Sequence, residues 1–179
     1  MTDVVVRAIA TDNLVCRNSA RYPAIELPKL AVYLVGKPAS IDHPSAFRGT
    51  VKDEWGNITA AGVEKAEPPT DLDDHNKLIV QKEGYHYVWT DITCDVAVEH
   101  IEAFKKDLRR RVSIAAMYQF MRCPGCTCGE DVFSEKCPNY FWELPYFERC
   151  GVVDALEISL VSTPAVRVAR VVSIDGVNL

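Results

Sequence analysis

The sequence predicts an α+β fold: a mostly antiparallel β-sheet or barrel with one central helix. A β-branched run at 4–10 and a mostly apolar run at 112–120 lie one in each half of the chain. The clearest helical spacing of apolar residues lies between them, at 95–108. Strands, a helix and further strands in this order are typical of α+β domains. With 179 residues, we expect a single domain over 1–179 that contains a Cys-rich irregular insert at 122–151.

The first half of the chain predicts short strands separated by turn residues. The continuous β-branched run 4–10 predicts a strand, and 11–29 is expected to be a loop. The apolar run 30–35 predicts a short buried strand, and two prolines make 37–46 a rigid polar loop. Two hairpins and a linker complete this half: strands at 46–51 and 57–63, a linker at 67–74, and strands at 78–81 and 85–90.

The second half begins with the central helix. Asp95 can cap its N-terminus, and the arginines at 109–111 suit the negative end of its dipole. A strand follows at 112–120, and the insert at 122–151 separates it from two further strands at 155–161 and 166–174.

Composition and charge exclude several classes of protein. Apolar residues make up 48% of the chain and charged residues 25%, which permits a buried core. The net charge of −5 argues against a specific nucleic-acid site, which requires a basic face. No apolar run approaches the roughly 20 residues of a membrane span, and the N-terminus lacks a signal-peptide pattern. We therefore expect a cytoplasmic protein without a membrane partner.

The cysteines form one group of candidate ligands. The chain has seven, and an odd number is unsuited to a disulfide framework. Cys123-Pro-Gly-Cys126 resembles a zinc knuckle, because two thiolates in a tight turn can bind one tetrahedral ion. The predicted structural zinc ligands are Cys123, Cys126, Cys128 and Cys137, with Cys150 as a further candidate. The alternative is a set of free thiols packed among the aromatic residues of the insert.

Three further segments carry a family resemblance. They are Ile41-Asp42-His43, Val112-Ser113-Ile114 and the stretch Glu157–Val161, which is followed by Pro164-Ala165. In this order they resemble the prohead proteases of tailed bacteriophages, which are related in fold to the herpesvirus assemblins. The resemblance covers about residues 30–164.

The resemblance implies a serine peptidase site. Ser113 would be the nucleophile, His43 its general base, and Glu157 the third member that orients the imidazole. Asp154 is the alternative third member. Ala115 stands where the family usually has a glycine, two residues after the serine.

Other residues of the family pattern are less well matched. Assemblins have a second histidine as the third member, but none of the remaining histidines lies in the late strand where it belongs: His75, His86 and His100. Arg167 and Arg170 resemble arginines that help to build the assemblin oxyanion site. A solvated strand face is the alternative reading of these two arginines.

The implied function is a serine endopeptidase that cuts scaffold and major capsid proteins, and itself, during prohead maturation. It would act inside the prohead, in the host cytoplasm, and would need no cofactor for catalysis. Assemblins suggest a homodimer. Two other functions remain open: a catalytically inactive virion component on the same fold, and a zinc-stabilised binding module.

Overall fold

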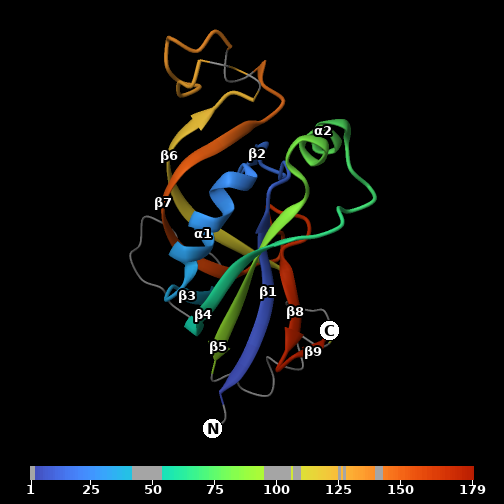
Figure 1. Cartoon of the computed structure of the whole chain (residues 1–179). Helices are drawn as coiled ribbons and strands as arrows, with labels where there is room; N and C mark the ends of the chain where they lie inside the picture. Colours follow the sequence, from blue (N-terminus) through green and yellow to red (C-terminus); the bar gives the residue numbers. More distant parts are fainter. Residues whose placement is uncertain are drawn as a thin grey trace.

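The computed structural model describes residues 3–41, 54–94, 106, 110–124, 126, 128–139 and 143–179. Within these ranges the chain forms a nine-stranded sheet with two short α-helices and a 3-10 turn (Figure 1). The α+β class is confirmed. The sheet is mixed, because β2 (Ala20–Arg21) and β3 (Pro38–Ile41) run parallel to β7 (Phe147–Leu160), while the other neighbouring pairs are antiparallel.

The order across the sheet is β2-β7-β3-β4-β5-β1-β8-β9, and β6 pairs with β7. The remaining strands are β1 (Val4–Asp12), β4 (Glu54–Lys65), β5 (His86–Cys94), β6 (Val112–Arg122), β8 (Arg170–Ile174) and β9 (Val177–Asn178). The 3-10 turn η1 (Ala24–Glu26) leads into α1 (Leu27–Leu34), and α2 (Asp74–Glu83) precedes β5. The strands predicted at 4–10 and 112–120 are therefore confirmed.

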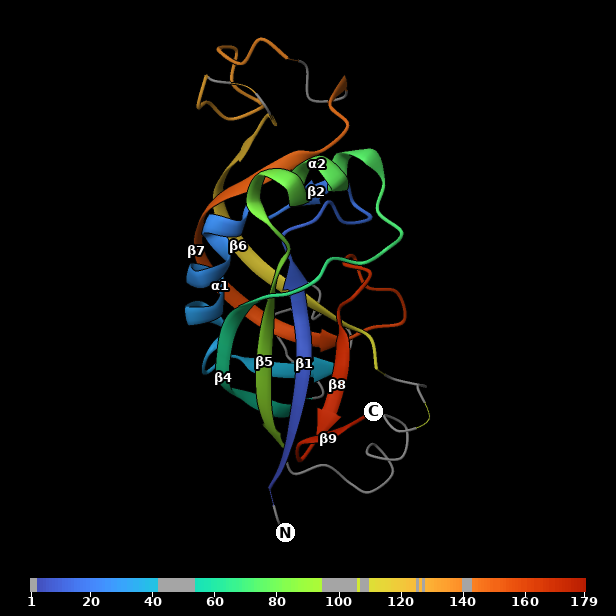
Figure 2. The ribbon, with the colours of Figure 1, turned by 45° about the vertical axis from the view of Figure 1, so that its right-hand side comes forward.

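The sheet curls until β6 meets β8 (Figure 2). The Val112 amide donates to the carbonyl oxygen of Ala169 at 3.2 Å, and the Val171 amide donates to that of Arg110 at 2.6 Å. This contact brings β6 between β7 and β8. Its consequence is a main apolar core on the concave side of the sheet, which includes Val112, Ile158 and Leu160.

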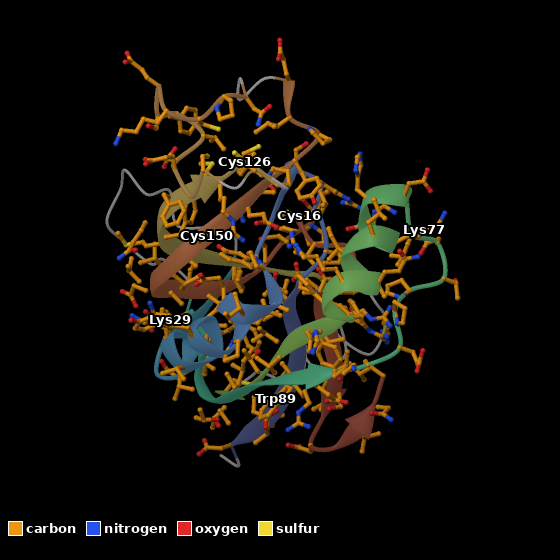
Figure 3. All side chains as sticks on the ribbon, turned by 45° about the horizontal axis from the view of Figure 1, so that its top comes forward. Cys16, Lys29, Lys77, Trp89, Cys126 and Cys150 are labelled. Atoms are coloured by element: carbon orange, nitrogen blue, oxygen red, sulfur yellow. The ribbon has the colours of Figure 1, made fainter. Side chains whose placement is uncertain are left out.

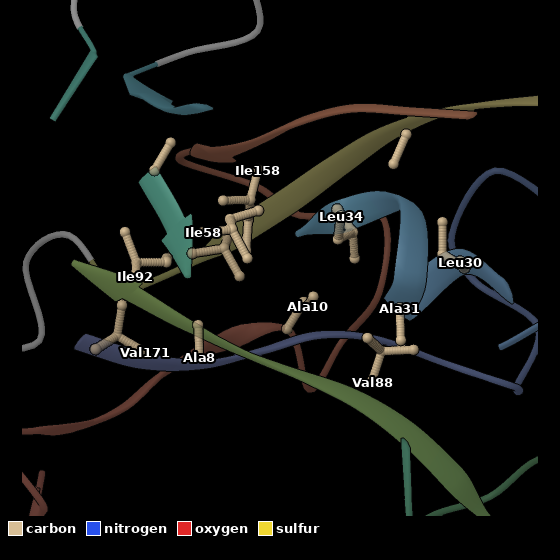
Figure 4. Packing of buried hydrophobic residues seen from close by; sticks show 14 of the residues in the cluster. Ala8, Ala10, Leu30, Ala31, Leu34, Ile58, Val88, Ile92, Ile158 and Val171 are labelled. Atoms are coloured by element: carbon tan, nitrogen blue, oxygen red, sulfur yellow. The ribbon is translucent and has the colours of Figure 1, made fainter. Parts of the chain in front are cut away.

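Helix α1 fills part of this core, so the strand predicted at 30–35 is wrong. Leu27, Leu30, Ala31 and Leu34 are buried at helical spacing, whereas Val32 is 72% exposed. Pro28 fits the first turn, where its missing N–H has no helical partner. Figure 4 shows the side chains of α1 directed toward the strands. A short apolar run does not distinguish a strand from a helix with one buried face.

Helix α2 replaces the strand predicted at 78–81. The carboxylate of Asp73 accepts a hydrogen bond from the amide of Asn76 at 2.8 Å, which caps the helix. Gly84, with a φ of 76°, ends it. The helix packs Ile79 against Leu14 and Tyr85 in a second, smaller apolar cluster. The strands predicted at 57–63 and 85–90 correspond to β4 and β5.

Other boundaries also differ from the prediction. The expected loops at 11–29 and 37–46 contain β2, the start of α1 and β3. The strand predicted at 155–161 forms the end of β7, and the last predicted strand begins only at Arg170. Residues 46–51 and the helix predicted at 95–108 lie outside the described residues, apart from Lys106. Neither helix of the described chain has the length and apolar character needed to cross a bilayer.

Candidate functional site

Ser113 lies in a row of three serines that crosses neighbouring strands. It pairs with Ser159 on β7, and Ser159 pairs in turn with Ser40 on β3. Residues in register share a face of the sheet, and alternate residues face opposite sides. Because Val112 and Ile158 enter the core, the three serines face away from it. Ser113 is half-buried, whereas Ser40 and Ser159 are buried.

Glu157 lies on the same face as this row. It pairs with Ala115, so it is the diagonal neighbour of Ser113 across the antiparallel ladder. Diagonal neighbours have Cα atoms about 7–8 Å apart, within reach of long side chains. Glu157 is only 2% exposed, and a buried carboxylate is well suited to orienting an imidazole. The structure therefore brings together two of the three predicted catalytic residues.

The predicted base, His43, lies outside the described residues. The chain reaches it two residues after Ile41, the last residue of β3. Ile41 pairs with Leu160, which follows Ser159 on β7 and pairs with Val112 on its other side. The described strand that leads to His43 thus ends beside the strand that carries Glu157.

The alternative third residue is engaged elsewhere. Asp154 forms an ion pair with Lys37 at 2.8 Å. The hydrogen bond from Lys37 holds the pKa of Asp154 below its usual value. Asp154 also pairs with Met117, four residues beyond Ser113 along β6. Glu157 is therefore better placed than Asp154 to act with Ser113.

The remaining polar residues of the family pattern do not join Ser113. Arg167 is 70% exposed and lies 3.9 Å from Asp71. Arg170 is exposed and pairs with Ile9 and Arg111. His75, which lies on α2, contacts the ring of Tyr146. His86 pairs with Lys65 on β4, and His100 lies outside the described residues.

A buried ion network joins the end of β6 to the start of β7, where the irregular segment between the two strands leaves the sheet. Arg21, 3% exposed, binds the carboxylates of Glu83 and Glu148 and the carbonyl oxygen of Asn13. Arg122 donates to the other oxygen of Glu148 at 2.6 and 2.9 Å. Burial alone would raise the pKa of Glu83, but the hydrogen bonds from Arg21 and the Ala24 amide, together with the nearby positive charges, outweigh it, and the pKa lies below its usual value.

The thiol groups lie just beyond this end of the strand pair, in the segment between β6 and β7 (Figure 3). The Sγ atoms of Cys123, Cys126 and Cys137 all lie within 4.8 Å of one another. Four thiolates around zinc, each about 2.3 Å from the metal, have sulfur atoms roughly 3.8 Å apart. The cluster could therefore hold a metal ion with modest adjustment of its side chains.

The fourth predicted ligand, Cys128, is not one of these three mutually close thiols, but it lies beside Cys126. Its Sγ is 2.9 Å from that of Cys126. Asn139 donates from Nδ2 to the sulfur of Cys123 at 3.2 Å, which orients that thiol. Burial, with Cys126 and Cys137 nearby, raises the pKa of Cys123. A bound cation would reverse this effect, because a coordinated thiol loses its proton.

The other described cysteines lie in different environments, away from the thiol cluster. Cys150 is buried opposite Phe120 on β6, and burial raises the pKa of its thiol to about 11. Cys94 is buried in the main core. Cys16 is half-buried, with its sulfur 2.8 Å from the carbonyl oxygen of Ala20.

Sequence reasoning missed Ser40 and Ser159, whose hydroxyl oxygens are buried without a hydrogen-bond partner among the described residues. Strand alternation could have pointed to Ser159, which follows Glu157 by two residues and so shares its face. Ser40 could not have been found, because it lay in a predicted loop.

Comparisons with protein-family models, curated proteins and solved structures found no match.

Proposed function

We propose that this protein is a serine endopeptidase with Ser113 as nucleophile, His43 as general base and Glu157 as the residue that orients His43. The observation that carries the proposal is the placement of Ser113 and Glu157 on one face of adjacent strands. The burial of Glu157 and the end of β3 beside β7, two residues before His43 in the sequence, add to it. The motif resemblance supplies the role of each residue.

The mechanism follows from these roles. His43 would accept the proton of the Ser113 hydroxyl as its oxygen attacks the scissile carbonyl carbon. The protonated imidazole would then donate that proton to the departing amine, leaving an acyl-enzyme on Ser113. A water molecule, deprotonated by His43, would hydrolyse the ester. Glu157 would hold the imidazole in the required tautomer and stabilise its positive charge.

The resemblance also suggests the substrates. Scaffold and major capsid proteins of a tailed phage, and this chain itself, would be cut inside the prohead within the host cytoplasm. A homodimer belongs to the same proposal. Ala115 favours the alternative of an inactive virion component, because a methyl group stands close to where the family has a glycine.

The thiol cluster carries a second proposal, a structural zinc ion bound by Cys123, Cys126, Cys128 and Cys137. Ser113 stands at the start of β6 and Cys123 just beyond its end. Ten residues of extended strand span about 33 Å, so this ion would not act on Ser113. It would cross-link an irregular segment that has few aliphatic residues, and that segment would be the surface of a zinc-stabilised binding module.

The peptidase proposal is tested by exposing a mixed peptide pool to the purified chain and identifying new termini by mass spectrometry. Wild type should generate them and Ser113→Ala should not. Ser173→Ala is the matched control, because it removes a buried hydroxyl from β8. Equal cleavage by Ser113→Ala, or none by any folded variant, contradicts the proposal. In the latter case, zinc bound to the chain would leave the binding module as the better account.

A further inference from the structure

A cavity lies away from the serine row, at the end of β1. It has a volume of about 240 Å³ and is bounded by the end of β1, the 69–73 linker, the start of α2 and residues 166–168. Pockets for drug-sized molecules usually have volumes of roughly 300–1,000 Å³. This cavity therefore suits one long side chain better than a complete small molecule.

The cavity combines apolar walls with acidic groups. Leu14, Leu72, Val166 and Val168 contribute aliphatic surface, and three aspartates stand against a single cation, Arg167. Asp71 lies 3.9 Å from Arg167, and both side chains are exposed. Asp73 caps α2. This leaves Asp12 as the buried carboxylate of the cavity.

Among the residues that the structure describes, Asp12 has few hydrogen-bond donors for a buried carboxylate. It is only 4% exposed, and its Oδ1 accepts one hydrogen bond, from the Leu14 amide at 3.1 Å. Oδ2 has a contact of 3.5 Å with the Tyr85 hydroxyl, longer than an ordinary O–H···O bond. Burial raises the pKa of Asp12 to about 6. A cation placed against Oδ2 would offset this cost of burial.

The cavity adjoins the proposed catalytic strand. A smaller hollow of about 20 Å³ is bounded in part by Ser113 and Ile114. It shares four lining residues with the larger cavity: Asp12, Leu14, Cys16 and Val166. The two cavities therefore meet at these four residues, and the smaller one extends from them to β6 at Ser113 and Ile114.

We propose that this cavity is a substrate subsite that binds a lysine or arginine side chain, with its aliphatic stem against Leu14 and Val166 and its charged end on Asp12. Lys and Arg side chains commonly bury the stem and pair the charged end. The proposal rests on the peptidase function, since it takes the bound polypeptide to be the substrate. It specifies a class of substrate: chains that carry a basic residue near the scissile bond.

The test measures binding apart from catalysis. Capped tripeptides Ala-Lys-Ala and Ala-norleucine-Ala are titrated by NMR into the full Ser113→Ala chain, which cannot cleave them. The two peptides share an aliphatic stem and differ in charge. We expect the lysine peptide to bind at least tenfold more tightly, and Asp12→Asn to remove that difference.

Two further variants make the result specific. Asp74→Asn removes the same charge from an exposed position outside the cavity lining, and it should preserve the preference for lysine. Val168→Phe fills the cavity with Asp12 intact, and it should weaken binding of both peptides. Equal binding of the two peptides, or a lysine preference that survives both Asp12→Asn and Val168→Phe, overturns the subsite.

Cleavage by the wild-type chain separates this inference from the function on which it rests. Asp12-dependent binding of lysine without cleavage would retain the cavity as a binding site and reject the peptidase. Cleavage of peptides without preference for a basic residue would retain the peptidase and reject the subsite.

Discussion

Ser113 and Glu157 are diagonal neighbours on one face of β6 and β7, since Ser113 pairs with Ser159 and Glu157 pairs with Ala115. The 43 residues between them in the sequence include the whole irregular Cys-containing segment. Strand pairing, rather than proximity in the chain, therefore brings these groups together. The strand β3, which ends two residues before His43 in the sequence, pairs with the other side of β7.

Glu157→Gln should lower kcat by about 10³–10⁴-fold with little change in KM. The loss of a carboxylate that orients a catalytic imidazole has an effect of this size. Asp154→Asn should leave both constants close to wild type, because Asp154 pairs with Lys37 instead. Steady-state kinetics on a cleaved peptide provide the measurement. A larger loss of kcat in Asp154→Asn than in Glu157→Gln would show that Asp154, not Glu157, orients His43.

The purified chain should contain about one zinc per molecule, bound by four cysteine thiolates. Cys126→Ser should lose the metal and lower the melting temperature. Cys16→Ser should retain it, because Cys16 lies near Ala20, outside the thiol cluster. Elemental analysis after desalting measures the metal. Equal metal content in the two variants would exclude the cluster as its site.

Arg21→Met should destabilise the fold by about 3–5 kcal/mol. The substitution leaves the buried carboxylate of Glu148 with only Arg122 and removes a partner of Glu83. Arg7→Met is the control, because the Arg7–Asp91 pair is partly exposed and should contribute about 1 kcal/mol or less. Urea unfolding at pH 7 compares the two. Similar losses would mean that the network contributes no more than a surface pair.

Asp12→Asn should stabilise the free protein at neutral pH. The pKa of Asp12 is raised from 3.8 to about 6, so the folded state binds this proton more tightly than the unfolded state. The resulting stability is complete below pH 3.8 and is lost as the pH rises through 6. A shift of this size corresponds to at most about 3 kcal/mol.

The pH dependence provides the check. Asp12→Asn should be about 1–3 kcal/mol more stable than wild type at pH 7, and close to it at pH 4. Thermal or urea unfolding at both values measures the difference. A variant that is less stable than wild type at pH 7 would show that the carboxylate contributes bonds that outweigh its burial.

Local patterns predicted part of the fold. β1 was found from its continuous β-branched run, and β6 from a mostly apolar run that contains Val, Ile, Tyr and Phe. The segments at 30–35 and 78–81 were assigned as strands but form helices. The segment 30–35 is too short and too uniformly apolar to show helical spacing. Around the segment 78–81, Asp73 and Gly84 could have indicated the two ends of a helix. The parallel pairing of β3 with β7 depends on tertiary contacts that no local pattern encodes.

The candidate site was predictable to a similar degree. The motifs singled out Ser113 and Glu157, but their adjacency required the register of β6 against β7. The thiol cluster was predictable from the Cys123-Cys126 spacing, although the approach of Cys137 depends on the course of the intervening chain. The cavity at Asp12 could not be predicted, because it forms between three segments that are far apart in the sequence: 12–16, 69–76 and 166–168.

The nucleophile is tested most directly by covalent labelling. The folded chain is treated with a fluorophosphonate, which reacts with activated serine hydroxyls, and the adduct is located by peptide mapping. We expect one adduct, on Ser113, that is absent from Ser113→Ala, greatly reduced in His43→Ala and retained in Ser173→Ala. No adduct on the folded wild-type chain, or labelling that is unchanged in Ser113→Ala, would contradict the assignment of Ser113 as the catalytic nucleophile.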